Sequence, residues 1–166
     1  MRKRAFFMFA ILLAGLGVVA PVQAQKAAEP DRPYVSGAEL TAMIDKIAAD
    51  IAAGKPGDGA NLLKSGPYAT HLEYRTAVHG GAIHERDSEL FYVLEGSGTL
   101  MLGGKLVDPK RANPTNINGS RVEGGTARKV SKGDTFIVPA GTPHWFSAID
   151  GRLVMTSMRL PVPASP

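Results

Sequence analysis

Two histidines and one glutamate are the residues of this sequence best suited to hold a metal ion. Glu89 follows His84 after four residues, and His144 comes much later in the chain. Two neutral imidazoles and one carboxylate suit a divalent first-row metal that keeps positions open for a substrate. Glu89 also opens an apolar run, Glu-Leu-Phe-Tyr-Val-Leu-Glu, where an unpartnered carboxylate facing the core would be costly. A metal ion or a hydrogen-bonded cation would remove that cost.

Short apolar runs separated by glycine-containing turns extend from Tyr68 to Leu160 and must position these residues. They predict strands at about 68–78, 82–86, 89–95, 98–102, 105–108, 127–130, 134–138, 144–149 and 152–160. Many short strands with few helices favour a small β-barrel or sandwich. The stretch from Asp108 to Thr126 is rich in Asn, Gly and charge, without periodicity, and we expect a long surface loop there.

One amphipathic helix is expected before the strands. Residues 25–35 are polar and predict a linker, and Ser36 with Glu39 forms a capping box. Gly54 is a natural helix end. Between them runs an apolar stripe with spacings of three and four, formed by Leu40, Met43, Ile44, Ile47 and Ile51. We expect this stripe to dock on the main domain or on a second subunit.

The spacing of these residues resembles the motifs of the cupin superfamily. The second half of the family's first motif is matched by His84, Glu89 and Gly96. Its second motif is matched by Gly133, Pro139, Gly141 and His144, except that Ala148 stands in place of the closing asparagine. The resemblance covers roughly Tyr68 to Leu160, most of the chain that remains after removal of the expected signal peptide. It implies an all-β fold, a double-stranded β-helix or jelly-roll barrel, with the site inside the barrel. The expected organisation is a signal peptide over 1–24, a linker and N-terminal helix over 25–66, and the cupin barrel over 67–162.

The first motif is incomplete in this chain. Ala82 stands where the family has the first histidine of a His-x-His pair. Metal-binding cupins use both of those histidines, the glutamate and the later histidine. The resemblance therefore implies His84, Glu89 and His144 as ligands of a divalent ion (Mn, Fe, Ni or Zn), with the fourth ligand missing. Three alternatives stay open: a three-residue site, replacement of the lost ligand by His79, or a metal-free pocket for an organic ligand.

Strand alternation predicts which residues line the cavity. Phe91 and Phe146 each lie two residues from an expected ligand, so they share its strand face and line the pocket, together with His79. His71 is a weaker candidate for the same wall. Phe136, Tyr92 and Trp145 are expected in the core, to which Phe146 also belongs.

The N-terminus carries the pattern of an export signal. Three basic residues at 2–4 precede an apolar stretch over 5–20, and small residues follow at positions 22 and 24. This predicts a secretory signal peptide cleaved before Gln25, and a periplasmic or secreted protein. The apolar stretch is shorter than a bilayer span requires, so we expect no stable membrane anchoring after cleavage.

Composition excludes several classes of protein. The 166 residues, 44% hydrophobic and 20% charged, suit one globular domain, and the absence of Cys excludes disulfides, thiolate ligands and Cys nucleophiles. Removing the signal takes three basic residues with it, which lowers the formal charge from +4 to +1. No basic run remains, so a nucleic-acid partner is not expected.

The function expected from the sequence is a small exported cupin that binds a divalent metal and acts on an unknown small organic substrate. The alternative is a cupin that binds a small ligand or a protein partner without metal and without catalysis. Because cupins are often dimers, the resemblance also implies a homodimer as a candidate assembly. No residue beyond the ligand set stands out as a catalytic acid or base, so the reaction is not predicted.

Overall fold

The computed structural model describes residues 30–162, and the expected signal peptide lies outside them. The described chain is mostly strand with a single helix, as expected. In chain order the elements are α1 (Gly37–Ala52), β1 (Gly59–Ser65), β2 (Tyr68–Arg75), β3 (Gly81–His84), β4 (Asp87–Leu102), β5 (Lys105–Val107), β6 (Lys110–Asn113), β7 (Asn116–Gly119), β8 (Arg121–Glu123), β9 (Thr126–Ser131), β10 (Thr135–Val138) and β11 (His144–Pro161). Within the described range, no helix has the length and apolar character needed to cross a membrane.

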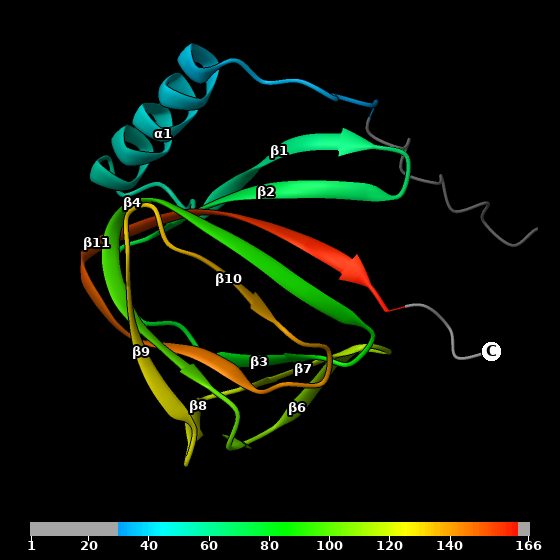
Figure 1. Ribbon diagram of the computed structural model, residues 1–166. Helices are drawn as coiled ribbons and strands as arrows, with labels where there is room; N and C mark the ends of the chain where they lie inside the picture. Colours follow the sequence, from blue (N-terminus) through cyan, green and yellow to red (C-terminus); the bar gives the residue numbers. More distant parts are fainter. Residues whose placement is uncertain (1–29, 163–166) are drawn as a thin grey trace, which may run out of the picture.

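The long strands β4 and β11 form the frame of the barrel (Figure 1). They pair antiparallel from His144↔Leu102 to Pro161↔Asp87. The other edge of β11 pairs with β2, which pairs with β1, while β9 and β10 pair with the other edge of β4. At its start, β11 also meets β3 through His144↔Ala82. The residues of interest therefore come from strands that are neighbours in one sheet.

Two glycine-containing segments that the sequence predicts as turns are bends inside continuous strands. The expected strands 89–95 and 98–102 form the single strand β4, and 144–149 and 152–160 form β11. Gly96 has φ +77°, and a Cβ there would lie 1.9 Å from the carbonyl oxygen of Arg152. The pairing of β4 with β11 shifts register between Ile149 and Leu153. Gly96 therefore bends one strand across a bulge in the other, rather than ending it.

The expected surface loop from Asp108 to Thr126 is instead largely paired, and that prediction was wrong. It contains β6, β7 and β8, with β7 pairing with β3 and β8 pairing with β5. Val122 is buried and supplies one apolar anchor. Hydrophobic periodicity did not show these strands because their order depends on backbone pairing between mostly polar residues. Strand β1 likewise lies where a linker was expected. Its apolar pattern is weak because Leu62 is the one side chain of this strand that is buried.

The N-terminal helix follows the sequence prediction closely. Ser36 caps α1, its hydroxyl accepting from the Glu39 N–H at 3.2 Å while the Glu39 carboxylate accepts from the Ser36 N–H at 2.8 Å. The predicted stripe packs against the outer face of the sheet, where Ile44 and Ile47 join Leu72 and Val154 in one core cluster. The stripe thus docks on the main domain, as one of the two expectations held.

A second core cluster fills the inside of the barrel. Phe91, Val93, Leu100 and Phe146 belong to it, and Phe136 packs against it. Tyr92 does not, because it alternates with Phe91 and Val93 and points to the outer face, where it is 47% exposed. The expectation that Tyr92 belongs to the core was therefore wrong. Trp145 is half-buried, and its indole donates to the His79 carbonyl at 2.7 Å.

Candidate metal centre

The three predicted ligands stand at the ends of strands that meet on one side of the barrel. His84 ends β3, Glu89 lies near the start of β4 and His144 begins β11. The turn before β11 joins two of them, because the Gly141 N–H donates to the His84 carbonyl at 2.7 Å. Gly141 has φ +74°, a conformation that glycine adopts without strain. The Pro-x-Gly turn therefore fixes His144 beside His84.

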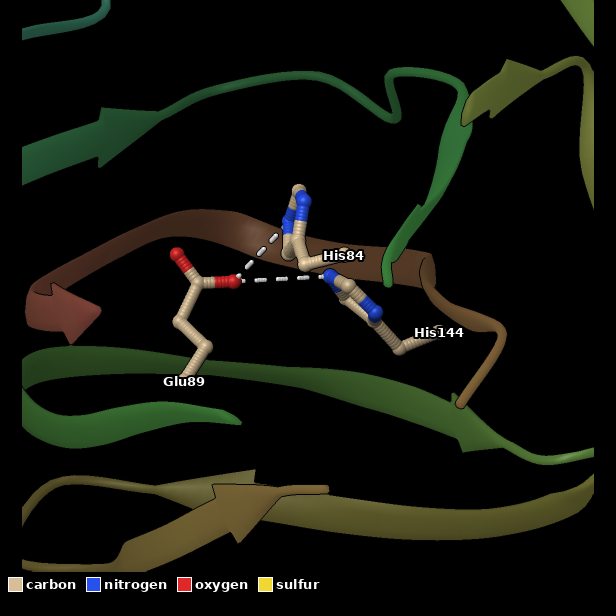
Figure 2. Close-up of side chains that lie close together, drawn as sticks. All are labelled: His84, Glu89 and His144. Atoms are coloured by element: carbon tan, nitrogen blue, oxygen red, sulfur yellow. Dashed lines mark ion pairs between the residues drawn. The ribbon is translucent and has the colours of Figure 1, made fainter. Parts of the chain in front are cut away.

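The three side chains converge in a buried space (Figure 2). The exposed fraction is 8% for His84, 6% for Glu89 and 7% for His144. Glu89 Oε2 lies 3.3 Å from His84 Nε2 and 3.6 Å from His144 Nε2. One ligand atom from each residue lies within 4.8 Å of the other two. The fold thus brings together the residues that the motifs singled out.

The outer nitrogens of both rings face hydrogen-bond acceptors. His84 Nδ1 lies 2.6 Å from Asn116 Oδ1, and His144 Nδ1 lies 3.2 Å from the Thr142 carbonyl. The orientation of the Asn116 amide is fixed because its Nδ2 donates to Asn113 Oδ1 at 2.9 Å. In the uncharged form of either ring, Nδ1 therefore carries the proton and Nε2 turns a lone pair towards Glu89, whereas a protonated ring donates from Nε2 to the carboxylate.

Arg159 on β11 completes the arrangement from the other side of the carboxylate. Its Nε donates to Glu89 Oε1 at 3.0 Å, and its Nη1 donates to Asn116 Oδ1 at 3.2 Å. Strand register explains the contact, because Arg159 pairs directly with Glu89 and Asn116 pairs directly with His84. One oxygen of Glu89 is thus held by a cation, and the other faces the two imidazoles.

The environment sets the charges of the acidic and basic groups. Burial alone would raise the pKa of Glu89, but a hydrogen bond with His84 and the charges of Arg159 and the two histidines lower it to about 2. Burial lowers the pKa of His144, against the opposing effects of the Thr142 carbonyl and Glu89. At neutral pH the site therefore holds a carboxylate and an uncharged His144 ring.

These residues fit a divalent ion. Zn–N and Zn–O bonds of about 2.0–2.2 Å place two ligand atoms of one ion roughly 3 Å apart, near the 3.3 and 3.6 Å seen here. When both rings are uncharged, the two Nε2 lone pairs and the Glu89 oxygen face one another in a buried space, and a cation among them removes their repulsion. Ala82 pairs directly with His144 and lies on the cavity wall. Because its methyl group supplies no ligand atom, this side of the site stays open.

A cavity of about 580 Å³ adjoins the cluster, a size typical of small-molecule sites. The predicted wall residues His79, Phe91 and Phe146 all line it, as does His71. His79 is exposed and lies outside the cluster of three. His79 therefore lies on the cavity wall and does not belong to the cluster of three.

Sequence reasoning missed two residues of the site, Asn116 and Arg159. Asn116 lies in the stretch that was expected to be a loop, and no periodic signal marks it. Arg159 does carry a weak signal, since it alternates with the apolar Met158 and Leu160 in a predicted strand. Its partner Glu89 is far away in the sequence, so only the pairing of β4 with β11 reveals the contact.

A comparison with protein families shows to which family the chain belongs. The model of the family described as Cupin matches residues 58–160, more than half of the chain. The chain belongs to the cupin superfamily. This cupin has no match among curated proteins.

Three solved structures illustrate the structural neighbours of this cupin. A protein from Bacillus halodurans is 18% identical with a TM-score of 0.49, and the match covers 81% of this chain and 85% of that one. A candidate mannose-6-phosphate isomerase from Ralstonia eutropha JMP134 is 16% identical with a TM-score of 0.45, covering 63% and 83%. Hydroxypropylphosphonic acid epoxidase from S. wedmorenis is 14% identical with a TM-score of 0.46, covering 61% and 49%. The cupin thus spans about half the length of that epoxidase.

Proposed function

We propose that this cupin is a metal-dependent enzyme that acts on a small organic substrate in the barrel cavity. His84, Glu89 and His144 would hold a divalent first-row ion through two nitrogens and one carboxylate oxygen. The observation that carries the proposal is the convergence of three possible ligand atoms, two of them on rings whose outer nitrogens face hydrogen-bond acceptors.

A divalent ion held there would polarise a carbonyl or hydroxyl group, or activate water or oxygen. The residues of the chain do the positioning. Asn116 and the Thr142 carbonyl orient the two rings, as outer partners of metal-bound histidines commonly do. Arg159 fixes the carboxylate plane of Glu89. Phe91 and Phe146 form an apolar wall beside the ligands that limits water around a bound substrate.

A second candidate function is ligand binding without metal and without turnover. The observation that favours it is the ion pair between Arg159 and Glu89. This pair gives the buried carboxylate a positive partner even when no metal is present, so the fold does not depend on an ion to compensate the charge. In this case the same cavity would capture a small molecule.

Metal analysis of protein purified from the compartment to which it is exported separates the two functions. The proposal expects about one first-row metal ion per chain, and loss of that ion in the Glu89→Ala, His144→Ala double variant. His71→Ala is the matched control, because it removes a histidine from the same cavity wall but outside the cluster. A native protein that stays metal-free after incubation with Mn, Fe, Ni and Zn would contradict the proposal.

Turnover is tested next on the metal-loaded protein. Candidate small molecules are first screened for a rise in Tm, and those that stabilise the protein are incubated with it for product analysis. Product formation that stops in the double variant supports an enzyme. Stabilisation without any product after long incubation supports the binding function instead.

We also propose that the protein works outside the cytoplasm, on the strength of the signal pattern over residues 1–24. Expression of the full chain should yield a mature protein that begins at Gln25 in the periplasmic fraction or the medium. A full-length protein retained inside the cell would contradict this proposal. The homodimer stays a prediction, and sedimentation of the mature protein tests it.

A further inference from the structure

We propose that the substrate of this cupin is a small organic acid, whose anionic group binds Arg159 while a neighbouring oxygen binds the metal. The inference rests on the proposed metal site and goes beyond it by naming the class of substrate. It is carried by the position, the spare hydrogen-bond donors and the charge of Arg159.

Arg159 has N–H groups that donate no hydrogen bond to the described part of the protein. A guanidinium group carries five N–H donors in a planar fork. In this structure one Nε–H is given to Glu89 and one Nη1–H to Asn116. No other described residue accepts from Arg159, so three N–H groups stay free. The side chain is 38% exposed and lines the cavity. A planar, permanently charged fork of this kind is suited to binding a carboxylate or phosphate group.

Arg159 also adjoins the metal position. Its Nε holds Glu89 Oε1, while Oε2 of the same carboxylate faces the two histidines. The guanidinium group thus contacts one oxygen of the Glu89 carboxylate, and the two histidine nitrogens face the other oxygen. A compact ligand with two adjacent oxygen groups can therefore reach both Arg159 and the metal position. An α-hydroxy acid or a short diacid has two such oxygen groups.

The charge of the loaded site favours an anion. A divalent ion together with Arg159 and Glu89 leaves two net positive charges at the cluster, of which Asp58, elsewhere on the cavity wall, offsets one. The other arginine of the wall is already neutralised, because Arg75 Nη2 lies 2.7 Å from Glu73 and its guanidinium stacks over Phe146 at 5.0 Å. The uncompensated positive charge therefore lies at Arg159 and the metal, and not at Arg75.

Ser157 supplies a second hydrogen-bond donor on the same face of β11 as Arg159. It lies two residues before Arg159 on β11, so both side chains point to the same face of the sheet. Ser157 is only 4% exposed and lines the cavity, yet no described residue forms a hydrogen bond with its hydroxyl. A buried hydroxyl that faces a cavity without a protein partner is a group that a ligand can satisfy.

The test compares an acid with its neutral analogue of similar size. Mature protein loaded with Co²⁺ is titrated with glycolate and with glycolamide, by calorimetry and by the Co²⁺ absorption spectrum. We expect glycolate to bind at least tenfold more tightly, because charge-assisted hydrogen bonds contribute roughly a tenfold to hundredfold preference. Glycolate should also change the cobalt spectrum, which reports coordination independently of any activity.

Variants locate the preference. Arg159→Gln should reduce the ratio of the two dissociation constants to less than about threefold, measured at saturating Co²⁺ so that a weaker metal site does not affect it. Arg159→Lys, which keeps the charge, should keep part of the preference and replaces the Gln variant if that protein does not fold. Ser157→Ala should weaken glycolate binding by several-fold. Arg75→Gln is the matched control and should leave the ratio unchanged.

The outcomes separate this inference from the function beneath it. Cobalt binding without a preference for glycolate, or a preference lost in Arg75→Gln instead of Arg159→Gln, overturns the organic-acid inference and leaves the metal site standing. Failure to bind cobalt at all overturns both. A preference that disappears in Arg159→Gln, with a spectral change in the wild type, supports both.

Discussion

Replacing Arg159 with methionine tests the charge balance of the site in the metal-free protein. The variant keeps an unbranched side chain about as long as the aliphatic part of arginine but leaves Glu89, 7% exposed at its side chain, without its cation. Removing one partner of a fully buried ion pair costs about 3–5 kcal/mol. Because water reaches Arg159, which is 38% exposed, we expect a smaller cost of about 2–4 kcal/mol.

The assay is urea and thermal unfolding of chelator-treated protein at neutral pH. For a domain of this size 1 kcal/mol corresponds to roughly 4 °C in Tm, so Arg159→Met should lower Tm by roughly 8–16 °C. Arg111→Met is the matched control, since Arg111 also pairs with a carboxylate, Glu85, but at 52% and 37% exposure. Surface pairs of this kind contribute at most about 1 kcal/mol.

The same substitution in a Glu89→Gln protein tests whether the loss of stability comes from the unpaired charge. In Glu89→Gln the buried negative charge is gone, so adding Arg159→Met should cost less than about 1 kcal/mol. Equal destabilisation by Arg159→Met in both backgrounds would refute the charge argument and assign the effect to packing. A loss in the wild-type background no larger than that of Arg111→Met would refute it as well.

Three further outcomes are expected. First, because the pKa of Glu89 is lowered to about 2 from 4.5, the unfolded chain takes up this proton at a higher pH than the folded one. The stability of the metal-free protein should therefore fall between about pH 4.5 and 2, and acid titration of Glu89→Gln should show a shallower loss. Second, Ala82→His places an imidazole opposite His144 and should tighten Co²⁺ binding by at least tenfold in chelator competition, whereas Ala82→Leu should not. Third, Asn116→Ala removes the acceptor of His84 Nδ1 and should weaken Co²⁺ binding by about 10–100-fold in the same assay, with Asn118→Ala as the exposed control on β7.

The parts of this cupin that the sequence predicted are those governed by local rules. The capping box at Ser36 and the apolar stripe of α1 depend only on helix geometry, so both could be predicted and both were found. The motif spacing singled out His84, Glu89 and His144 because each stands at a fixed offset from a turn. The family resemblance then implied the jelly-roll barrel and a site inside it, which the offsets alone do not give.

The parts that the sequence did not predict depend on pairing between distant segments. The role of Asn116 arises only because β7 aligns it with His84, and β7 itself consists of the residues Asn-Ile-Asn-Gly, which carry little strand signal. Tyr92 was misplaced because its strand is apolar on both faces, and the outer face is covered by α1 over only part of its length. Composition does not distinguish the covered part of that face from the exposed part.

The position of β11 has a consequence for the order in which the site is built during synthesis. This strand is the last element of the described chain, and it carries both His144 and Arg159. A growing chain that ends before β11 contains Glu89 and His84 but neither the second imidazole nor the cation that balances the carboxylate. The cluster of candidate metal ligands is therefore complete only after the final strand has paired with β2 and β4. Tight metal binding would consequently report that the whole barrel has closed.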